Sequence, residues 1–304
     1  MRKNLFIFCF GIFLGGFLTY FLNFSQTKLE NFFTAQITKP LEEINFVKIE
    51  RQKKSLPDLE VKAVISLRLN PKKKISEKVL YSKNEDEILP IASLTKLMTA
   101  LVVIEDPENY PLNKEVKISR EAAFQIDVPE YGNLKPGERK TIYDLLNFML
   151  FFSSNDAAFA LAEQIDVKNF VNRMNQKAKE IGLENTYFSN PTGLDPENLK
   201  WSLENKDHFN YSTARDLVLL GKYILKNYPL IFEFSNLKNK IQLLENQYLI
   251  GMKTGYTNEA GGCIFLVFSN DKGDYFLNVI LGAKSREERF LQMQKLVDWI
   301  NGKI

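Results

Sequence analysis

The sequence predicts an α+β fold in which one antiparallel sheet is flanked by helices. A β-rich segment opens the globular part, helical patterns dominate the middle, and short β-rich segments return before a final helix. Strands from both ends of such a chain pair most simply into one antiparallel sheet, which the helices then cover. With 304 residues, of which 45% are hydrophobic and 25% charged, the chain can bury a core of this kind.

The first element is an uncharged apolar run from Leu5 to Phe24, which Arg2 and Lys3 precede. About twenty helical residues cross the roughly 30 Å hydrocarbon layer, so the run predicts one transmembrane helix. Residues 1–24 would then form a short cytoplasmic tip and the transmembrane anchor. A cleaved signal peptide is the alternative, but the run is longer than usual and no small-x-small cleavage site follows it. The positive-inside rule then places everything after the anchor outside the cytoplasm.

Residues 25–59 are charged, contain Pro40 and Pro57, and predict a juxtamembrane spacer. A hairpin then opens the globular domain, residues 60–304, and helical periodicity and β-rich runs predict its other elements. Gly182 is a typical C-cap, and Ser285 a typical N-cap. The expected strands are 61–67, 79–81, 247–253, 262–268 and 275–281, and the expected helices are 93–104, 142–150, 156–165, 167–181, 213–225 and 285–300.

Composition excludes several functions. A net charge of +3 gives no electrostatic reason to expect nucleic acid as a partner. Two cysteines and one histidine cannot form a disulfide framework or a cysteine-rich zinc site, so we expect no metal and no cofactor. A Ser-His-Asp triad would depend on His208 alone, and Cys263, in an apolar strand, is expected to be a packing residue.

The most informative pair is Ser93 and Lys96, three residues apart at the start of an apolar-periodic helix. This spacing puts both side chains on one helix face. A serine hydroxyl is a weak nucleophile until a base takes its proton, and a desolvated lysine one turn away can be that base. The pair therefore predicts nucleophilic serine catalysis without histidine.

Two further motifs distinguish this Ser-x-x-Lys pair, whose spacing recurs at residues 25–28, 235–238 and 269–272. Ser153-Ser154-Asn155 follows a helical stretch, and Lys253-Thr254-Gly255 lies on a predicted strand. Taken singly, Ser153 would be interpreted as a helix N-cap and Lys253 as a solvated strand end. The three motifs in this order favour one active site.

With these motifs the sequence resembles the penicillin-binding serine DD-peptidases, in particular the D-alanyl-D-alanine carboxypeptidases. The likeness extends over residues 61–300. It is carried by the stretches 90–99, 153–158, 190–194 and 253–257. It implies a DD-peptidase/β-lactamase-like fold with a helical subdomain, a location on the bacterial cell membrane, and no cofactor.

The resemblance implies a role for each residue of the first two motifs. Ser93 would attack the carbonyl between the two D-alanines of a peptidoglycan stem peptide, and Lys96 would be the general base. Ser153 would relay a proton to the leaving amine, and Asn155 would hydrogen-bond the substrate backbone. β-Lactam antibiotics would then act as covalent inhibitors on Ser93.

The third motif would bind the substrate. Lys253 and Thr254 would hold its terminal carboxylate, and the backbone N–H groups of Ser93 and Tyr256 would form the oxyanion hole. Gly255 lacks a Cβ, which lets a substrate lie along the strand edge.

Two other functions remain open at this point. A serine β-lactamase would need Ser-Asp-Asn and a glutamate that activates water, whereas here the middle motif is Ser153-Ser154-Asn155, with serine where glycine is frequent in the family. A non-catalytic wall-binding relative would keep the fold but would not need a nucleophile with its base.

Overall fold

The computed structural model describes residues 56–72, 77–125, 133–199, 208–234 and 241–302. The predicted anchor at 5–24 and almost all of the spacer at 25–59 lie outside these residues. Within the described ranges, every helix is too short or too polar to span a bilayer.

The described strands form a five-stranded antiparallel sheet, as expected, with the order β2-β1-β9-β8-β7. The first strand pairs directly with the last, for Ala63 lies opposite Leu281. The two ends of the domain therefore meet in the middle of the sheet. The strands are β1 (Ala63–Leu69), β2 (Glu77–Lys83), β7 (Gln247–Thr257), β8 (Gly261–Asn270) and β9 (Tyr275–Ala283).

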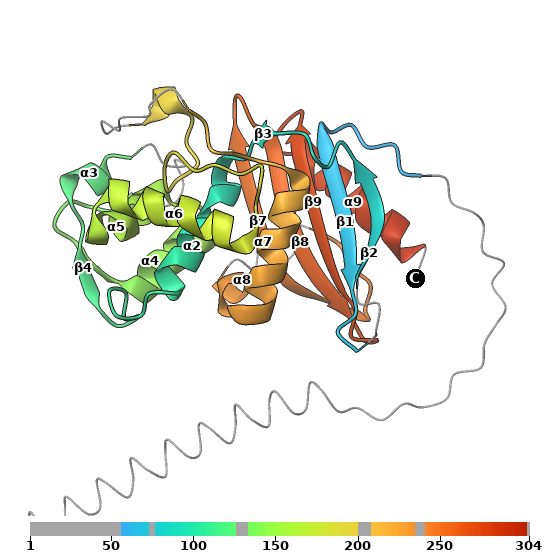
Figure 1. The fold of residues 1–304 in the computed structure, drawn as a ribbon, viewed down its shortest axis with the longest axis horizontal. Helices are drawn as coiled ribbons and strands as arrows, with labels where there is room; N and C mark the ends of the chain where they lie inside the picture. Colours follow the sequence, from blue (N-terminus) through green and yellow to red (C-terminus); the bar gives the residue numbers. More distant parts are fainter. Residues whose placement is uncertain (1–55, 73–76, 126–132, 200–207, 235–240, 303–304) are drawn as a thin grey trace, which may run out of the picture. The chain divides into compact units, whose positions relative to one another are not determined.

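Alternating residues of the strands face two separate cores. Val64 and Ile280 belong to the core under the final helix, α9 (Glu288–Asn301), whereas Ile65 and Val279 belong to the larger core on the opposite face. Figure 1 shows α9 behind the sheet and α7 (Ala214–Asn227) in front of it. Successive residues of a strand thus point to opposite faces of the sheet and pack in different cores.

The remaining helices lie mostly beside the sheet (Figure 1). Eight of the nine residues of α2 are buried, so this helix is the centre of the helical part. Gly182 ends α6 in a left-handed conformation with φ of 86°, as predicted. These helices are α2 (Lys96–Ile104), α3 (Arg120–Ala123), α4 (Ile142–Phe151), α5 (Asn155–Ala162), α6 (Val167–Ile181) and α8 (Leu230–Phe234).

Several short elements were missed because they carry too few residues for a periodic signal. They are the strand pair β3 (Leu89–Pro90) and β6 (Tyr211–Ser212), the strand pair β4 (Glu115–Lys117) and β5 (Arg139–Thr141), the helices α3 and α8, and the 3₁₀ turn η3 (Pro196–Asn198). The helix expected over 156–165 is found as α5 followed by a separate 3₁₀ turn, η2 (Glu163–Ile165).

Two helix starts differ from the prediction. The helix expected over 93–104 begins as a 3₁₀ turn, η1 (Ala92–Thr95), before α2. The helix expected from Ser285 begins at Glu288, although the Ser285 hydroxyl still accepts hydrogen bonds from the backbone N–H groups of Glu287 and Glu288.

Candidate active site

Ser93 lies in η1, on a segment that the short β3–β6 pair leads into. The Ile91 N–H donates to the Asn210 carbonyl at 3.2 Å, and the next residue, Ala92, has an unusual φ of 46°. An alanine adopts this conformation only where the surrounding packing holds it. Ser93 therefore sits at a tightly constrained turn into α2.

Lys96, at the first position of α2, is buried and joins the first two motifs. Its Nζ lies 2.9 Å from Ser93 Oγ, 2.6 Å from Asn155 Oδ1 and 2.6 Å from the Thr192 carbonyl oxygen. Amide and carbonyl oxygens only accept hydrogen bonds. In a neutral amine the two N–H groups would serve these oxygens, and the lone pair would face the Ser93 hydroxyl.

Ser153 lies at the junction of α4 and α5 with a left-handed φ of 65°. It does not cap α5, because the Ser154 hydroxyl accepts from the Ala157 N–H at 3.1 Å instead. The N-cap interpretation of Ser153 was therefore wrong. The Ser154 cap leaves the Ser153 hydroxyl to face β7, where it accepts from Lys253 Nζ at 2.8 Å.

Lys253 is the second buried lysine of the site, with a relative exposure of 2%. Burial, together with the positive charges of Lys96 and Arg289, lowers its pKa well below the ordinary value. Among the described residues, Nζ donates to Ser153 Oγ and to the Thr254 carbonyl at 3.1 Å. An ammonium group has three N–H donors, so one remains for an anionic ligand.

Gly255 has a structural reason in addition to the predicted one. A Cβ at this position would lie 2.8 Å from the backbone nitrogen of Ser93 and 2.9 Å from the Ala92 Cβ. Glycine is thus required because η1 packs directly against β7. Since β7 is an edge strand, Thr254 and Tyr256 lie where an extended peptide can join the sheet.

Arg289 is a site residue that sequence reasoning missed. It extends from α9, and its Nη1 donates to the Gly255 carbonyl at 2.6 Å. Burial lowers the pKa of this guanidinium to about 10, so it stays charged at neutral pH. In the sequence it is one of several charged residues at the start of a helix, with no signal that it turns towards β7.

The second missed contribution is the Thr192 carbonyl, in the turn 189–194. Residues 190–194 are one of the stretches that carry the family resemblance in the sequence. The Thr192 contact was not predicted, because a main-chain carbonyl is not recognisable from the residue type. Asn190 Oδ1 holds the turn closed by accepting from the N–H groups of Thr192 and Gly193 at 3.1 and 2.7 Å.

Cys263 behaves as expected. It is fully buried in β8, and burial raises the pKa of its thiol to about 11. The neutral thiol is therefore a core group and not a nucleophile.

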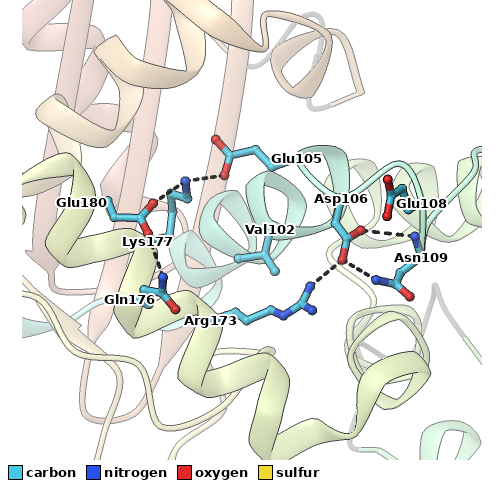
Figure 2. Close-up of a pocket in the computed structure, with 9 residues that line it drawn as sticks. All are labelled: Val102, Glu105, Asp106, Glu108, Asn109, Arg173, Gln176, Lys177 and Glu180. Carbon is cyan, nitrogen blue, oxygen red and sulfur yellow. Dashed lines mark hydrogen bonds and ion pairs between the residues drawn. The ribbon is translucent and has the colours of Figure 1, made fainter.

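A cavity of about 430 Å³ lies elsewhere, at the C-terminal end of α2 beside α6 (Figure 2). Its basic groups are already ion-paired, Lys177 with Glu105 and Glu180, and Arg173 with Asp106. None of the predicted site residues lines it. The lining residues are Val102, Glu105, Asp106, Glu108, Asn109, Arg173, Gln176, Lys177 and Glu180.

Comparisons with known proteins agree with this arrangement. The profile of the D-alanyl-D-alanine carboxypeptidase family matches residues 53–285. The chain is 37% identical over 243 residues to D-alanyl-D-alanine carboxypeptidase DacF of Bacillus subtilis, covering 73% of this chain and 58% of that one. It is 32% identical to a D-alanyl-D-alanine endopeptidase of Pseudomonas aeruginosa, covering 73% of each.

A solved structure gives the same result. Penicillin-binding protein D2 of Listeria monocytogenes, in its cefotaxime-bound form, superposes with a TM-score of 0.63 at 27% identity, over 80% of this chain and 98% of that one. The chain spans less than two thirds of the length of DacF. Its own residues 53–285, three motifs included, nevertheless match the family throughout, and the chain belongs to the D-alanyl-D-alanine carboxypeptidase family.

Proposed function

We propose that the protein is a serine-type D-Ala-D-Ala carboxypeptidase that removes the terminal D-alanine from peptidoglycan stem peptides through an acyl-enzyme on Ser93. The contact between Lys96 Nζ and Ser93 Oγ carries this proposal. Its geometry supports a lysine base. When Lys96 is neutral, its two N–H groups can donate to Asn155 Oδ1 and to the Thr192 carbonyl, and its lone pair is left for the Ser93 hydroxyl.

In the acylation step, Ser93 Oγ bonds to the penultimate carbonyl carbon while its proton passes to Lys96. The C–N bond to the terminal D-alanine then breaks, and the Ser153 hydroxyl gives its proton to the leaving nitrogen. Ser153 regains a proton from Lys96, which is therefore neutral again before the second step. The 2.8 Å contact from Lys253 supports this role, since an adjacent cation makes a hydroxyl a better proton donor. The amine leaves as free D-alanine.

In the second step, water attacks the ester carbon and the bond to Ser93 Oγ breaks. The proton of the water returns to Ser93 through Lys96. The backbone N–H groups of Ser93 and Tyr256 would stabilise the negative oxygen in both steps, a contribution worth about 3–4 kcal/mol per donor in other acyl-transfer enzymes.

The charge distribution favours a substrate with a free terminal carboxylate. Lys253 is buried and carries a remaining N–H donor, and Thr254 follows it on the edge strand. An extended peptide aligned with β7 would bring its carboxylate to these two residues while its scissile carbonyl reaches Ser93.

Labelling with a fluorescent penicillin tests the nucleophile. We expect one covalent adduct on the wild-type protein, none on Ser93→Ala, and an unchanged adduct on Ser269→Ala, whose serine has the same spacing to a lysine. Persistent labelling of Ser93→Ala would move the nucleophile elsewhere.

Product analysis tests the reaction. Release of D-alanine from a peptide ending in D-Ala-D-Ala, together with a long-lived penicillin adduct, is the expected outcome. Rapid turnover of penicillin without D-alanine release would indicate a serine β-lactamase, and cleavage of cross-linked peptides alone would indicate an endopeptidase. A wall-binding protein without turnover would give neither product nor adduct.

We further propose that residues 5–24 anchor the protein in the bacterial cell membrane, with 25–59 as spacer and 60–304 as an extracytoplasmic catalytic domain. The uncharged run behind Arg2 and Lys3 supports this assignment. The full chain should fractionate with membranes, and a chain starting near Pro57 should be soluble and still label with penicillin. Recovery of native protein in the soluble fraction, cut near Ser25, would contradict the anchor.

A further inference from the structure

Asn210 is a buried side chain that connects two segments of the site. Its Oδ1 accepts from the Ser189 N–H and hydroxyl, both at 2.8 Å, and from the Asn190 N–H at 3.1 Å. Its Nδ2 donates to Thr95 Oγ1 at 2.9 Å and to the Asn190 carbonyl at 2.8 Å. Both amide protons and the carbonyl oxygen are therefore used.

The two segments hold opposite sides of the same lysine. Thr95 belongs to η1, which carries Ser93, and the turn 189–194 carries the Thr192 carbonyl that accepts from Lys96. The turn packs closely against η1: a Cβ on Gly193 would lie only 2.0 Å from the Ala92 carbonyl oxygen.

Hydrogen bonds to the Asn190 side chain also connect the residues of the turn to one another. Asn190 Oδ1 accepts from the N–H and the hydroxyl of Thr192 and from the Gly193 N–H, at 3.1, 2.9 and 2.7 Å. A shift of the Asn190 backbone, which Asn210 holds, is thereby transmitted to the Thr192 carbonyl.

We propose that Asn210 is a positioning residue for the general base. By holding η1 and the turn in a fixed relation, it sets the Thr192 carbonyl where it binds one N–H of Lys96 and directs the lone pair of that lysine at Ser93 Oγ. This inference rests on the proposed function, in which Lys96 is the base for acylation.

The physical consequence is specific to the chemical step. Without the Asn210 side chain, the Ser189 and Asn190 N–H groups lose their acceptor, and the turn must move to find another. A displacement of about 1 Å in a catalytic group can cost about a hundredfold in rate. Lys253 and Thr254 lie on β7 and have no contact with Asn210 among the described hydrogen bonds, so initial binding of a carboxylate is unaffected.

The test compares Asn210→Ala with Asn175→Ala by stopped-flow acylation with fluorescent penicillin over a range of concentrations. Asn175 is a matched control, because from α6 it clamps the N–H and the carbonyl of Phe188, one residue before the turn. It has no described hydrogen bond to η1. We expect the limiting acylation rate constant of Asn210→Ala to fall about ten- to a hundredfold with an unchanged half-saturating concentration. Asn175→Ala should acylate like the wild type.

A second variant covers the case in which Asn210→Ala folds poorly. Thr95→Val keeps the shape of the side chain but removes the oxygen to which Asn210 donates. Its rate constant should also fall, and the double variant should lose less than the product of the two single losses, since both changes break one linkage.

Each result decides between distinct interpretations. A purely structural role would lower the fraction of protein that reacts but leave the rate constant at the wild-type value, and this outcome would overturn the proposal. An equal loss in Asn175→Ala would also overturn it. Absence of any adduct on the wild-type protein would refute the proposed function itself.

Discussion

Lys253 Nζ lies 2.8 Å from Ser153 Oγ and thereby joins the edge strand of the sheet to the junction between two helices of the helical part. Lys96 makes the corresponding connection within the helical part, from Ser93 to Asn155. Each of two buried lysines therefore contacts one serine, and the positive charge of Lys96 contributes to the lowered pKa of Lys253.

Replacement of Ser153 should separate its chemistry from its conformation. Ser153→Ala and Ser153→Gly both remove the hydroxyl, so both should reduce the acylation rate by the same factor. At a φ of 65°, however, alanine costs about 1 kcal/mol more than glycine. Denaturant unfolding should find Ser153→Gly the more stable variant, and equal stabilities would contradict the strained conformation.

Replacement of Lys96 should slow acylation even when the new side chain keeps the positive charge. Lys96→Arg keeps a positive charge but cannot accept the proton of Ser93, so penicillin acylation should slow by several orders of magnitude. Lys272→Arg is the control, because Lys272 has the same spacing to a serine in the turn after β8. Near-normal acylation in Lys96→Arg would exclude Lys96 as the base.

The lowered pKa of Lys253 predicts a pH-dependent KM. The charged form binds the terminal carboxylate, so KM should rise as the pH passes upwards through the lowered pKa, well before the ordinary lysine value of 10.5. Lys253→Arg stays protonated, so its KM should not change with pH over the same range. A flat KM in the wild-type protein would argue against a lysine that binds substrate.

The same shift has a defined sign for stability. Between the lowered folded pKa and 10.5, the unfolded chain holds a proton that folded Lys253 has lost, so the free energy of unfolding rises with pH. Below that pH range Lys253 is protonated in both the folded and the unfolded state, and the buried charge lowers the free energy of unfolding by its full amount. The stability gained in Lys253→Met should therefore be largest at low pH and shrink as the pH approaches 10.5, as urea titrations at several pH values would show.

Gly255→Ala should disturb the nucleophile directly. The new methyl group would meet the Ser93 nitrogen at 2.8 Å, so η1 must move away from β7. Overpacking of this kind costs about 1–3 kcal/mol, and we expect acylation to fall with it.

Gly182→Ala is the matched control for this change. Its φ of +86° makes alanine unfavourable, but no atom lies within 4 Å of the added Cβ. It should lose about 1 kcal/mol of stability through the backbone alone and keep full activity. Equal effects of the two substitutions on acylation would contradict the close packing of η1 on β7.

Much of the fold followed from local patterns. The long helices were found because a period of 3.6 persists over many residues, and the long strands because β-rich runs are bounded by turn residues. Gly182 was found because glycine tolerates the left-handed conformation. The 3₁₀ turn at Ser93 was not found. It packs closely against Gly255, far away in the sequence, and no local pattern records such a tertiary contact.

For the site, the side chains of the three motifs were predicted. The structure joins Lys96 to Ser93 and Asn155 by hydrogen bonds, and it joins Lys253 to Ser153. The supporting contacts were missed for identifiable reasons. Thr192 contributes only its main chain, and Arg289 resembles any helical surface charge until the helix is docked on the sheet.

The pairing of β1 with β9 determines when the protein can work. β1 is the first strand of the sheet to be synthesised, but its neighbour in the middle of the sheet, β9, is synthesised after the other four strands. Until then one edge of β1 stays unpaired, and the sheet that supports Lys253 lacks its centre. Long-range pairing of this kind slows folding and exposes strand edges to aggregation. Nascent chains should therefore be inert towards penicillin until β9 has been synthesised and has paired with β1.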